Sequence, residues 1–168
     1  MVYLIGYMGA GKTTITKLLS DELHLPFYDT DQEIEKKQNR SVSEIFKKDG
    51  ELYFRILETE LLNNINQNSI ISCGGGLPIH NNNMELINSK GISIYLKASN
   101  KCLFNRLKKE KQTRPLIENI TDEKLYIYID KELQIRSPFY NLSNHTILVD
   151  NKSTNEVLRE INSLISTI

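Results

Sequence analysis

The residues best suited to chemistry lie near the start of the chain, where residues 6–13 read Gly-Tyr-Met-Gly-Ala-Gly-Lys-Thr. In this pattern, Gly-x-x-x-x-Gly-Lys-Ser/Thr, the glycines let backbone N–H groups converge on a polyphosphate. Lys12 is expected to reach the outer phosphates, and Thr13 to bind magnesium through its hydroxyl. An apolar run precedes the pattern, and apolar residues at helical spacing follow it. The sequence therefore predicts a nucleotide phosphate site, and an ordinary glycine-rich turn is the weaker alternative.

Two carboxylates follow the second apolar run, in the sequence Asp29-Thr30-Asp31. Open α/β sheets place their ligand crevice at the carboxyl ends of the strands. Asp29 could hold a water of a magnesium ion, and Asp31 could accept the proton of an attacking hydroxyl, as phosphoryl transfer requires. The alternative is that an aspartate here only caps the following helix.

Arg55 and Glu58 are three residues apart in a segment that we expect to be helical, with Leu52, Ile56, Leu57 and Leu61 supplying its buried contacts. A guanidinium held by Glu58 could bind a carboxylate of a substrate in bidentate fashion. The alternative is an ion pair on the protein surface.

Three consecutive glycines, Gly74, Gly75 and Gly76, follow the third apolar run, directly after Cys73. Such a run is unsuited to a strand and suggests that backbone approaches a ligand closely, although a flexible turn would also accommodate it. The pattern gives no functional account of Cys73.

Two arginines late in the chain, Arg114 and Arg136, each stand near a proline. Arg114 lies in a polar stretch, roughly residues 108–124, that we expect to be a mobile and exposed lid. An arginine on such a segment can close over a transferring phosphoryl group and offset its charge. Taken singly, each arginine could equally be an exposed side chain without a role.

Short apolar runs at residues 2–5, 26–28, 69–73, 92–96 and 146–149 alternate with amphipathic segments. Each run is too continuously apolar to face water on one side, so the pattern predicts five parallel strands covered on both faces, a doubly wound α/β sandwich of three layers. Ser41 with Glu44 and Ser153 with Glu156 fit helix capping boxes, and Gly50 fits a helix end. The length favours a single domain over residues 1–168.

The composition points to a small partner molecule. Lys and Arg total 21, as do Asp and Glu, so no net field favours nucleic acid or an anionic membrane. Cys73 and Cys102 lack the spacing of a disulfide framework or metal site, which favours free thiols in the cytoplasm. The chain enters its first strand almost at once and has no long apolar run, so we expect neither a leader peptide nor a membrane span.

Taken together, the phosphate loop, Asp29-Thr30-Asp31, Phe54-Arg55-x-x-Glu58, Gly74-Gly75-Gly76, Arg114-Pro115-Leu116 and Arg136 closely resemble the shikimate kinase family in order and spacing. The resemblance covers nearly the whole chain. It implies transfer of the γ-phosphoryl group of ATP to the 3-hydroxyl of shikimate, a step toward chorismate and the aromatic amino acids. It also implies a fold like that of nucleoside monophosphate kinases, with sheet order 2-3-1-4-5 and a helical shikimate-binding region at roughly residues 31–62. We expect the protein to act as a monomer.

The resemblance also implies residue roles. Contacts to ATP fall on Gly9, Ala10, Gly11, Lys12, Thr13, Thr14 and Arg114, and contacts to shikimate fall on Asp31, Arg55, Gly74, Gly75, Gly76 and Arg136. Asp31, Lys12 and Arg114 take the catalytic roles. Magnesium is held by Thr13 and, through water, by Asp29. The adenine contacts are not placed; the lid and the loop near residues 150–153, with Lys152, are the candidates.

Two other functions remain open from the residues. Another small-metabolite kinase, acting on gluconate or a nucleoside monophosphate, would share the phosphate loop. A regulatory module would bind ATP and phosphorylate nothing small.

Overall fold

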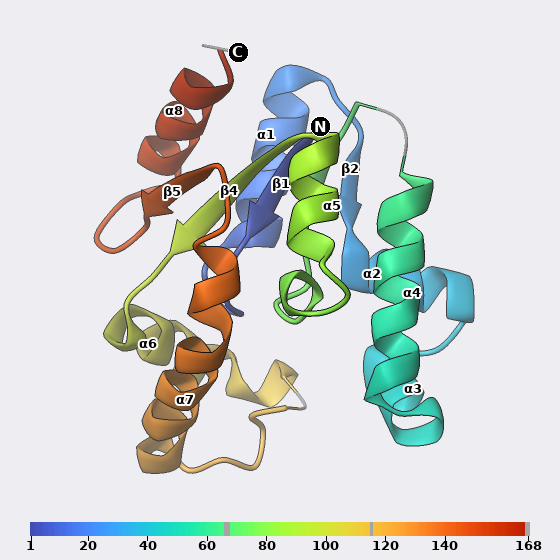
Figure 1. The fold of residues 1–168 in the computed structure, drawn as a ribbon. Coiled ribbons are helices and arrows are strands. Elements are labelled where there is room, and N and C mark those ends of the chain that lie inside the picture. Colours follow the sequence, from blue (N-terminus) through green and yellow to red (C-terminus); the bar gives the residue numbers. More distant parts are fainter. Residues whose placement is uncertain (66–67, 115, 167–168) are drawn as a thin grey trace.

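The computed structural model describes residues 1–65, 68–114 and 116–166, and within them five strands form one parallel sheet (Figure 1). The strands are β1 (Val2–Ile5), β2 (Phe27–Asp29), β3 (Ile70–Ser72), β4 (Ile92–Lys97) and β5 (His145–Leu148). Their order is β2-β3-β1-β4-β5, and β1 pairs with β3 on one side and β4 on the other. Both the five strands and the order 2-3-1-4-5 are confirmed, and each strand boundary lies within one residue of the expected position.

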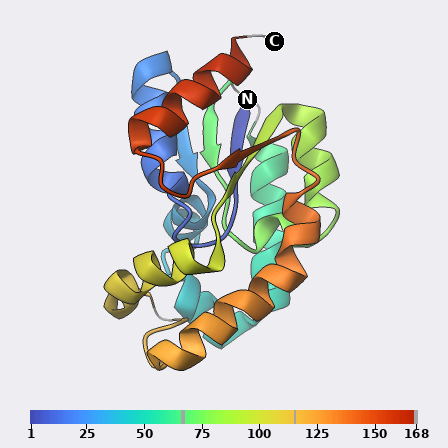
Figure 2. The same cartoon turned by 90° about the vertical axis from the view of Figure 1, so that its left-hand side faces the viewer.

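Helices cover both faces of the sheet. They are α1 (Lys12–Leu23), α2 (Thr30–Gln38), α3 (Val42–Asp49), α4 (Glu51–Asn64), α5 (Asn83–Lys90), α6 (Asn100–Glu110), α7 (Asp122–Tyr140) and α8 (Thr154–Ile165), with short 3₁₀ turns η1 (Leu77–Ile79) and η2 (Lys111–Thr113). Figure 2 shows α1 and α8 on one face and α4, α5 and α7 on the other, so the three-layer arrangement is confirmed. No helix in the described ranges is long and apolar enough to cross a membrane.

Local sequence sets several helix ends. Ser41 and Ser153 each accept a hydrogen bond from the backbone of the glutamate three residues later, and both capping boxes are complete. Gly50 ends α3 with a φ of 85°, a conformation that side chains with a Cβ rarely adopt. These predicted helix signals are therefore confirmed.

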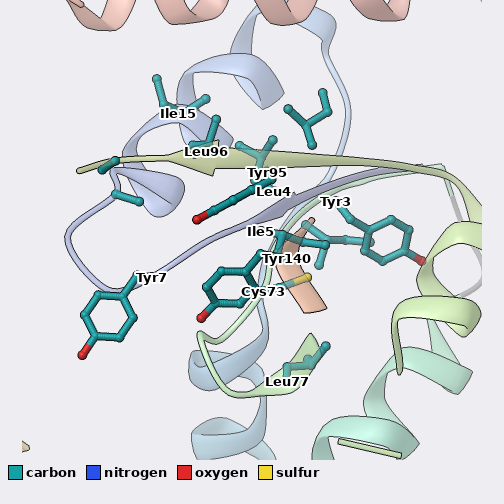
Figure 3. Packing of buried hydrophobic residues seen from close by; sticks show 14 of the residues in the cluster. Tyr3, Leu4, Ile5, Tyr7, Ile15, Cys73, Leu77, Tyr95, Leu96 and Tyr140 are labelled. Atoms are coloured by element: carbon teal, nitrogen blue, oxygen red, sulfur yellow. The ribbon is translucent and has the colours of Figure 1, made fainter. Parts of the chain in front are cut away.

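The core lies between the sheet and its helices (Figure 3). Tyr3, Leu4 and Ile5 of the central strand are fully buried, as the continuous apolar run predicts for a parallel strand. Cys73 belongs to this core, and burial raises the pKa of its thiol. Both Cys73 and Cys102 are free.

Two expectations about burial are wrong. On α4, Leu61 is buried and Leu57 packs against the core as expected, but Leu52 and Ile56 are 80% and 52% exposed. The helix packs through Phe54 and Leu62 together with Leu61. The edge strand β5 is not buried along its length, and Leu148 is 59% exposed, because only β4 pairs with it.

The expected lid at residues 108–124 is also more structured than its composition suggests. Residues 108–110 end α6, η2 follows, and α7 begins at Asp122. Ile117 is fully buried, whereas Leu116 is largely exposed, and Pro115 lies outside the described residues. The segment is therefore not uniformly exposed.

Candidate functional site

The loop between β1 and α1 lies at the carboxyl end of the central strand. Gly9 and Gly11 have φ values of 80° and 97°, so these turns require glycine. The Lys12 ammonium donates hydrogen bonds to Gly6 O (2.8 Å) and Tyr7 O (3.0 Å) and thereby closes the loop around itself. The helix starts at Lys12, so the free N–H groups of its first turn form an anion site.

This loop forms one wall of a cleft of about 530 Å³. The cleft is lined by residues from most of the predicted ligand-binding segments, among them Gly9, Ala10, Gly11, Lys12, Thr13, Thr14, Asp29, Asp31, Gly74, Gly75 and Arg114. The structure therefore brings the phosphate loop, the paired carboxylates and the first two glycines of the run into one cavity, whereas Gly76, Arg55 and Arg136 are not among the residues that line it.

Lys12 and Asp31 have perturbed acidity because both are withdrawn from water. Burial lowers the pKa of Lys12 to about 8, and the charge of Asp31 opposes that change. Burial raises the pKa of Asp31 to about 6, Asp29 raises it further, and Lys12 lowers it. A carboxyl with a raised pKa is a better proton acceptor than an exposed aspartate, provided that it is ionised.

Side-chain oxygen atoms of Thr13, Asp29 and Ser72 lie close together beside the phosphate loop. The Thr13 hydroxyl donates to Asp29 Oδ2 at 2.8 Å, and the Ser72 hydroxyl lies 3.4 Å from Thr13 Oγ1. Asp29 also caps α2, since Gln32 N donates to its other oxygen at 3.4 Å. The cap is therefore confirmed, and it leaves one carboxylate oxygen directed at Thr13, where the expected role of Asp29 toward magnesium stays a prediction.

The donors at this point fit magnesium. Mg²⁺ in phosphate sites takes one or two protein oxygens and completes its shell with water and phosphate oxygens. A hydroxyl and a carboxylate beside the phosphate loop supply such a partial set. In the described part of the chain, no group of three or more His, Cys, Asp or Glu residues could enclose a metal without a substrate.

The glycine run is the surface on which three distant side chains converge. A Cβ on Gly74 would collide with Asp31 Oδ1, and one on Gly76 would collide with the Arg55 guanidinium. At Gly75, an added Cβ would lie 3.3 Å from Arg136 Nη1. Glycine is needed here because functional side chains approach the backbone. Asp31, Arg55 and Arg136 therefore converge on three consecutive backbone positions, although only Asp31 of the three also lines the cleft described above.

Arg55 is held in place by two carboxylates. Its Nη1 donates to Glu58 Oε2 at 2.8 Å, and its Nη2 donates to Glu51 Oε1 at 2.6 Å. The Arg55 and Glu58 side chains are 11% and 1% exposed, so this is not a surface ion pair. Burial raises the pKa of Glu58 to about 7, although Arg55 opposes the change.

Arg136 is held differently. It pairs with Glu132 one turn earlier on α7, and its guanidinium lies over the ring of Tyr7, 5.3 Å from the ring centre. The Tyr140 hydroxyl interacts with Arg136 and donates to Gly75 O at 2.6 Å. Arg136 is thus fixed between the phosphate loop and the glycine run.

Arg114 lines the cleft, and its Nη2 donates to Glu110 Oε2 at 2.5 Å. It lies on the phosphate side of the cleft with Lys12, whose pKa it lowers through charge. The structure places Arg114 with the residues of the phosphate loop rather than with Arg55 and Arg136, and its contact with ATP stays a prediction.

Several residues of the site were not identified from the sequence. Arg106 donates to Gly9 O at 3.0 Å and lines the cleft, Ser72 joins the oxygen group, and Tyr7 and Tyr140 contact Arg136. Ser72 carries a usable signal, because a hydroxyl at the carboxyl end of a strand faces the crevice. Lys152 also lines the cleft, but its ammonium pairs with Glu160.

Comparison with known proteins agrees with this geometry. A family model described as shikimate kinase matches residues 8–166. A shikimate kinase of Flavobacterium johnsoniae is 43% identical over 98% of both chains, and one of Bacteroides fragilis is 41% identical over 89% of this chain and 84% of its own.

Solved structures agree as well. The crystal structure of shikimate kinase from Bacteroides thetaiotaomicron superposes with a TM-score of 0.92 at 34% identity, covering 98% of this chain and 97% of that one. Shikimate kinase from Acinetobacter baumannii in complex with shikimate gives 0.86 at 32% identity, covering 99% and 92%. This chain belongs to the shikimate kinase family.

Proposed function

We propose that this protein phosphorylates the 3-hydroxyl of shikimate with ATP, and that Asp31 is the residue at which its two substrates meet. The observation that carries the proposal is the position of Asp31. Its carboxylate interacts with Lys12 of the phosphate loop and with Arg55, and it packs against Gly74. A group so placed can reach a hydroxyl on one substrate and the terminal phosphate of the other.

The chemistry needed from the protein is mainly positioning and charge neutralisation. Asp31 orients the 3-hydroxyl and accepts its proton as the oxygen attacks phosphorus. Lys12 and the first-turn N–H groups of α1 hold the phosphates, and Arg114 offsets charge on the transferring group. Because Lys12 and Asp31 are withdrawn from water, their interactions with the reacting groups are strengthened.

Magnesium would be held by the Thr13 hydroxyl and, through water, by Asp29. When bound, it neutralises phosphate charge and orients the polyphosphate for transfer. Thr13 and Asp29 are already joined by a hydrogen bond, so both oxygens face the same point beside the loop.

The acid is recognised by Arg55 and Arg136, with backbone groups of Gly74, Gly75 and Gly76 lining the pocket. A guanidinium presents a planar fork that matches a carboxylate. Two arginines and one aspartate complement a small acid that carries several hydroxyls. A nucleoside monophosphate would instead require phosphate and base contacts.

The defining assay incubates the protein with ATP, Mg²⁺ and shikimate and detects phosphorylated acid by mass spectrometry. We expect shikimate phosphate to form, and we expect gluconate and nucleoside monophosphates to be phosphorylated far more slowly. ATP hydrolysis without a phosphorylated acid would reject the proposal. Preferred phosphorylation of gluconate would instead identify the protein as a gluconate kinase.

The acid site is tested separately with Arg55→Ala and Arg136→Ala. Each change leaves the substrate carboxylate without a charged partner, so we expect the KM for shikimate to rise by about 10² or more. The KM for ATP should stay within about threefold of wild type. Arg159→Ala on α8 is the control, because Arg159 is exposed and remote from the glycine run. An unchanged KM for shikimate in both variants would refute the assignment.

We further propose that the enzyme acts as a monomer in the cytoplasm. Two free thiols, one in the core, suit a reducing compartment. Each substrate contact proposed above comes from the same chain.

A further inference from the structure

Tyr7 occupies a variable position of the phosphate loop, yet its side chain does not face the phosphates. Its carbonyl accepts from Lys12, whereas its ring lies under the guanidinium of Arg136, 5.3 Å from the ring centre. Figure 3 shows the ring at the margin of the core, with its hydroxyl directed away from the aliphatic side chains. The main chain of Tyr7 therefore serves one substrate site and its side chain borders the other.

We propose that Tyr7 is a positioning residue for shikimate binding: the face of its ring holds Arg136 in the orientation that receives the substrate carboxylate. The inference rests on the role proposed above for Arg136. Tyr7 would act through Arg136 and would not itself touch the acid.

The physical reason is that a ring face restrains an arginine without using its hydrogen-bond donors. The negative face of an aromatic ring attracts a guanidinium, most strongly where water is excluded. The ring contact itself occupies none of the five N–H groups of the arginine, so the groups not engaged by Glu132 and Tyr140 stay available for a substrate carboxylate. Tyr7 is only 1% exposed, so the contact with Arg136 is shielded from water.

Arg55, the other arginine proposed to bind the acid, also lies over aromatic rings. Arg55 lies over the rings of Phe46 and Phe54, at 5.7 and 5.6 Å, and its edge is held by Glu51 and Glu58. Arg136 has one such ring, Tyr7, and one carboxylate, Glu132. The Tyr140 hydroxyl is a third support, so Arg136 has one support fewer than Arg55, and within the described residues Tyr7 is the only aromatic face that it lies over.

The hydroxyl of Tyr7 is separable from its ring. It is buried and has no hydrogen-bond partner within the described residues, although Tyr128, Glu132, Arg136 and Tyr140 lie near enough to affect its pKa. Burial raises that pKa, so the phenol stays neutral and offers Arg136 no charge. If the ring is the functional part, phenylalanine should replace tyrosine with little loss.

The experiment compares Tyr7→Leu, Tyr7→Phe and Tyr3→Leu in steady-state assays. We expect Tyr7→Leu to raise the KM for shikimate about five- to thirtyfold, the range for a desolvated cation–π contact. The KM for ATP should stay within about twofold and kcat within about threefold, because the phosphates and the base are untouched. Tyr7→Phe should stay within about twofold of wild type in all three parameters.

Tyr3→Leu is the matched control, because Tyr3 is an equally buried tyrosine of the same segment and its hydroxyl contacts Met1. It should lower the melting temperature and leave the KM for shikimate unchanged. An equal rise in that KM for Tyr3→Leu would show that general loosening of the core is responsible. An equal rise for Tyr7→Phe would assign the effect to the hydroxyl. Either result overturns the proposal.

A second series remains decisive even if Tyr7→Leu fails to fold. Phenylalanine with one, two and three ring fluorines, placed at position 7, keeps the shape of the side chain and weakens the negative ring face stepwise. We expect log KM for shikimate to rise steadily with fluorine number, while log KM for ATP stays constant. A flat series would overturn the inference.

Arg136→Ala separates this inference from the proposed function. If Arg136→Ala leaves the KM for shikimate unchanged, the assignment of Arg136 itself fails. If Arg136→Ala raises that KM while the Tyr7 series is flat, only the role of Tyr7 fails.

Discussion

Asp31 illustrates how burial can suit a single side chain to the proton transfer proposed for it. An exposed aspartate is a weak base, but burial raises the pKa of Asp31 to about 6, and Lys12 keeps its carboxylate form accessible. The residue also stands in the first turn of α2, where helix N–H groups favour negative charge. The raised pKa makes the Asp31 carboxylate a stronger base, while Lys12 and the helix N–H groups keep it ionised.

The first prediction concerns Asp31→Asn. The amide keeps the size of the carboxyl but cannot accept the hydroxyl proton, so kcat should fall by about 10² to 10⁴. The KM for ATP should change by less than about threefold, because Lys12 and the loop backbone are retained. Glu33→Gln, on the same helix but paired with Lys36 at the surface, is the control and should keep full activity. Near-normal turnover of Asp31→Asn would exclude proton transfer to this residue.

Residues within short motifs were predictable from the sequence, and residues that act across the fold were not. Lys12 and Thr13 follow from the spacing of the phosphate loop alone. Tyr7 and Tyr140 could not be found in that way, because their roles depend on a contact between the first strand's loop and α7. Nothing in the local pattern around Tyr7 indicates that Arg136 will lie above its ring.

At the scale of elements, the loop after β3 is shaped by what approaches it. Arg55 reaches the site from α4 and packs against the backbone of Gly76 in the space that a side chain would fill. This loop precedes η1, which packs under it through the buried Leu77 and Pro78. It therefore has little freedom to move away.

The second prediction concerns Gly76→Ala. The added methyl would displace the Arg55 guanidinium, so the KM for shikimate should rise by about tenfold or more while the protein remains folded. Gly50→Ala is the control. Nothing lies within 4 Å of a Cβ at Gly50, but its φ of 85° strains any side chain. That control should lower the melting temperature without changing KM, and the reverse pattern would contradict our account of the glycine run.

Whether a segment is a helix or a strand was predictable, because the spacing of its apolar residues is a local property of the sequence. Which of its side chains are buried was not predictable in this way. Helix α4 was correctly predicted, yet Leu52 and Ile56 lie on its exposed side. Both faces of that helix carry large apolar residues, so the pattern does not say which one meets the core. The exposure of Leu148 has a similar cause, since an apolar run does not reveal that its strand lies at a sheet edge.

For the whole molecule, the site lies between two groups of helices at the carboxyl ends of the strands. The carboxyl ends of the strands point toward α2 and α3 on one side and α6 and α7 on the other, while both termini lie at the opposite end of the sheet (Figure 1). The strand order was available only through resemblance to a known family, because pairing between distant strands leaves no local pattern. Parallel strands themselves were predictable, since their continuous apolar runs require cover on both faces.

A buried carboxylate at the centre of this arrangement should link global stability to pH. Glu58 is 1% exposed, and one of its oxygens has no hydrogen-bond partner among the described residues. Its pKa rises from 4.5 to about 7, mainly because burial disfavours the charged form. The folded state therefore binds this proton more tightly than the unfolded chain does.

The last prediction compares the unfolding free energies of wild type and Glu58→Gln at about pH 5 and about pH 8. Because the folded-state pKa of Glu58 is raised, its contribution favours folding below the unfolded value of 4.5 and is lost as the pH rises through about 7. Glutamine does not titrate, so wild type should lose on the order of 3 kcal/mol relative to the variant. Urea unfolding measures the difference directly. A difference that grows in favour of wild type with rising pH would mean that Arg55 outweighs burial and keeps Glu58 ionised in the folded protein.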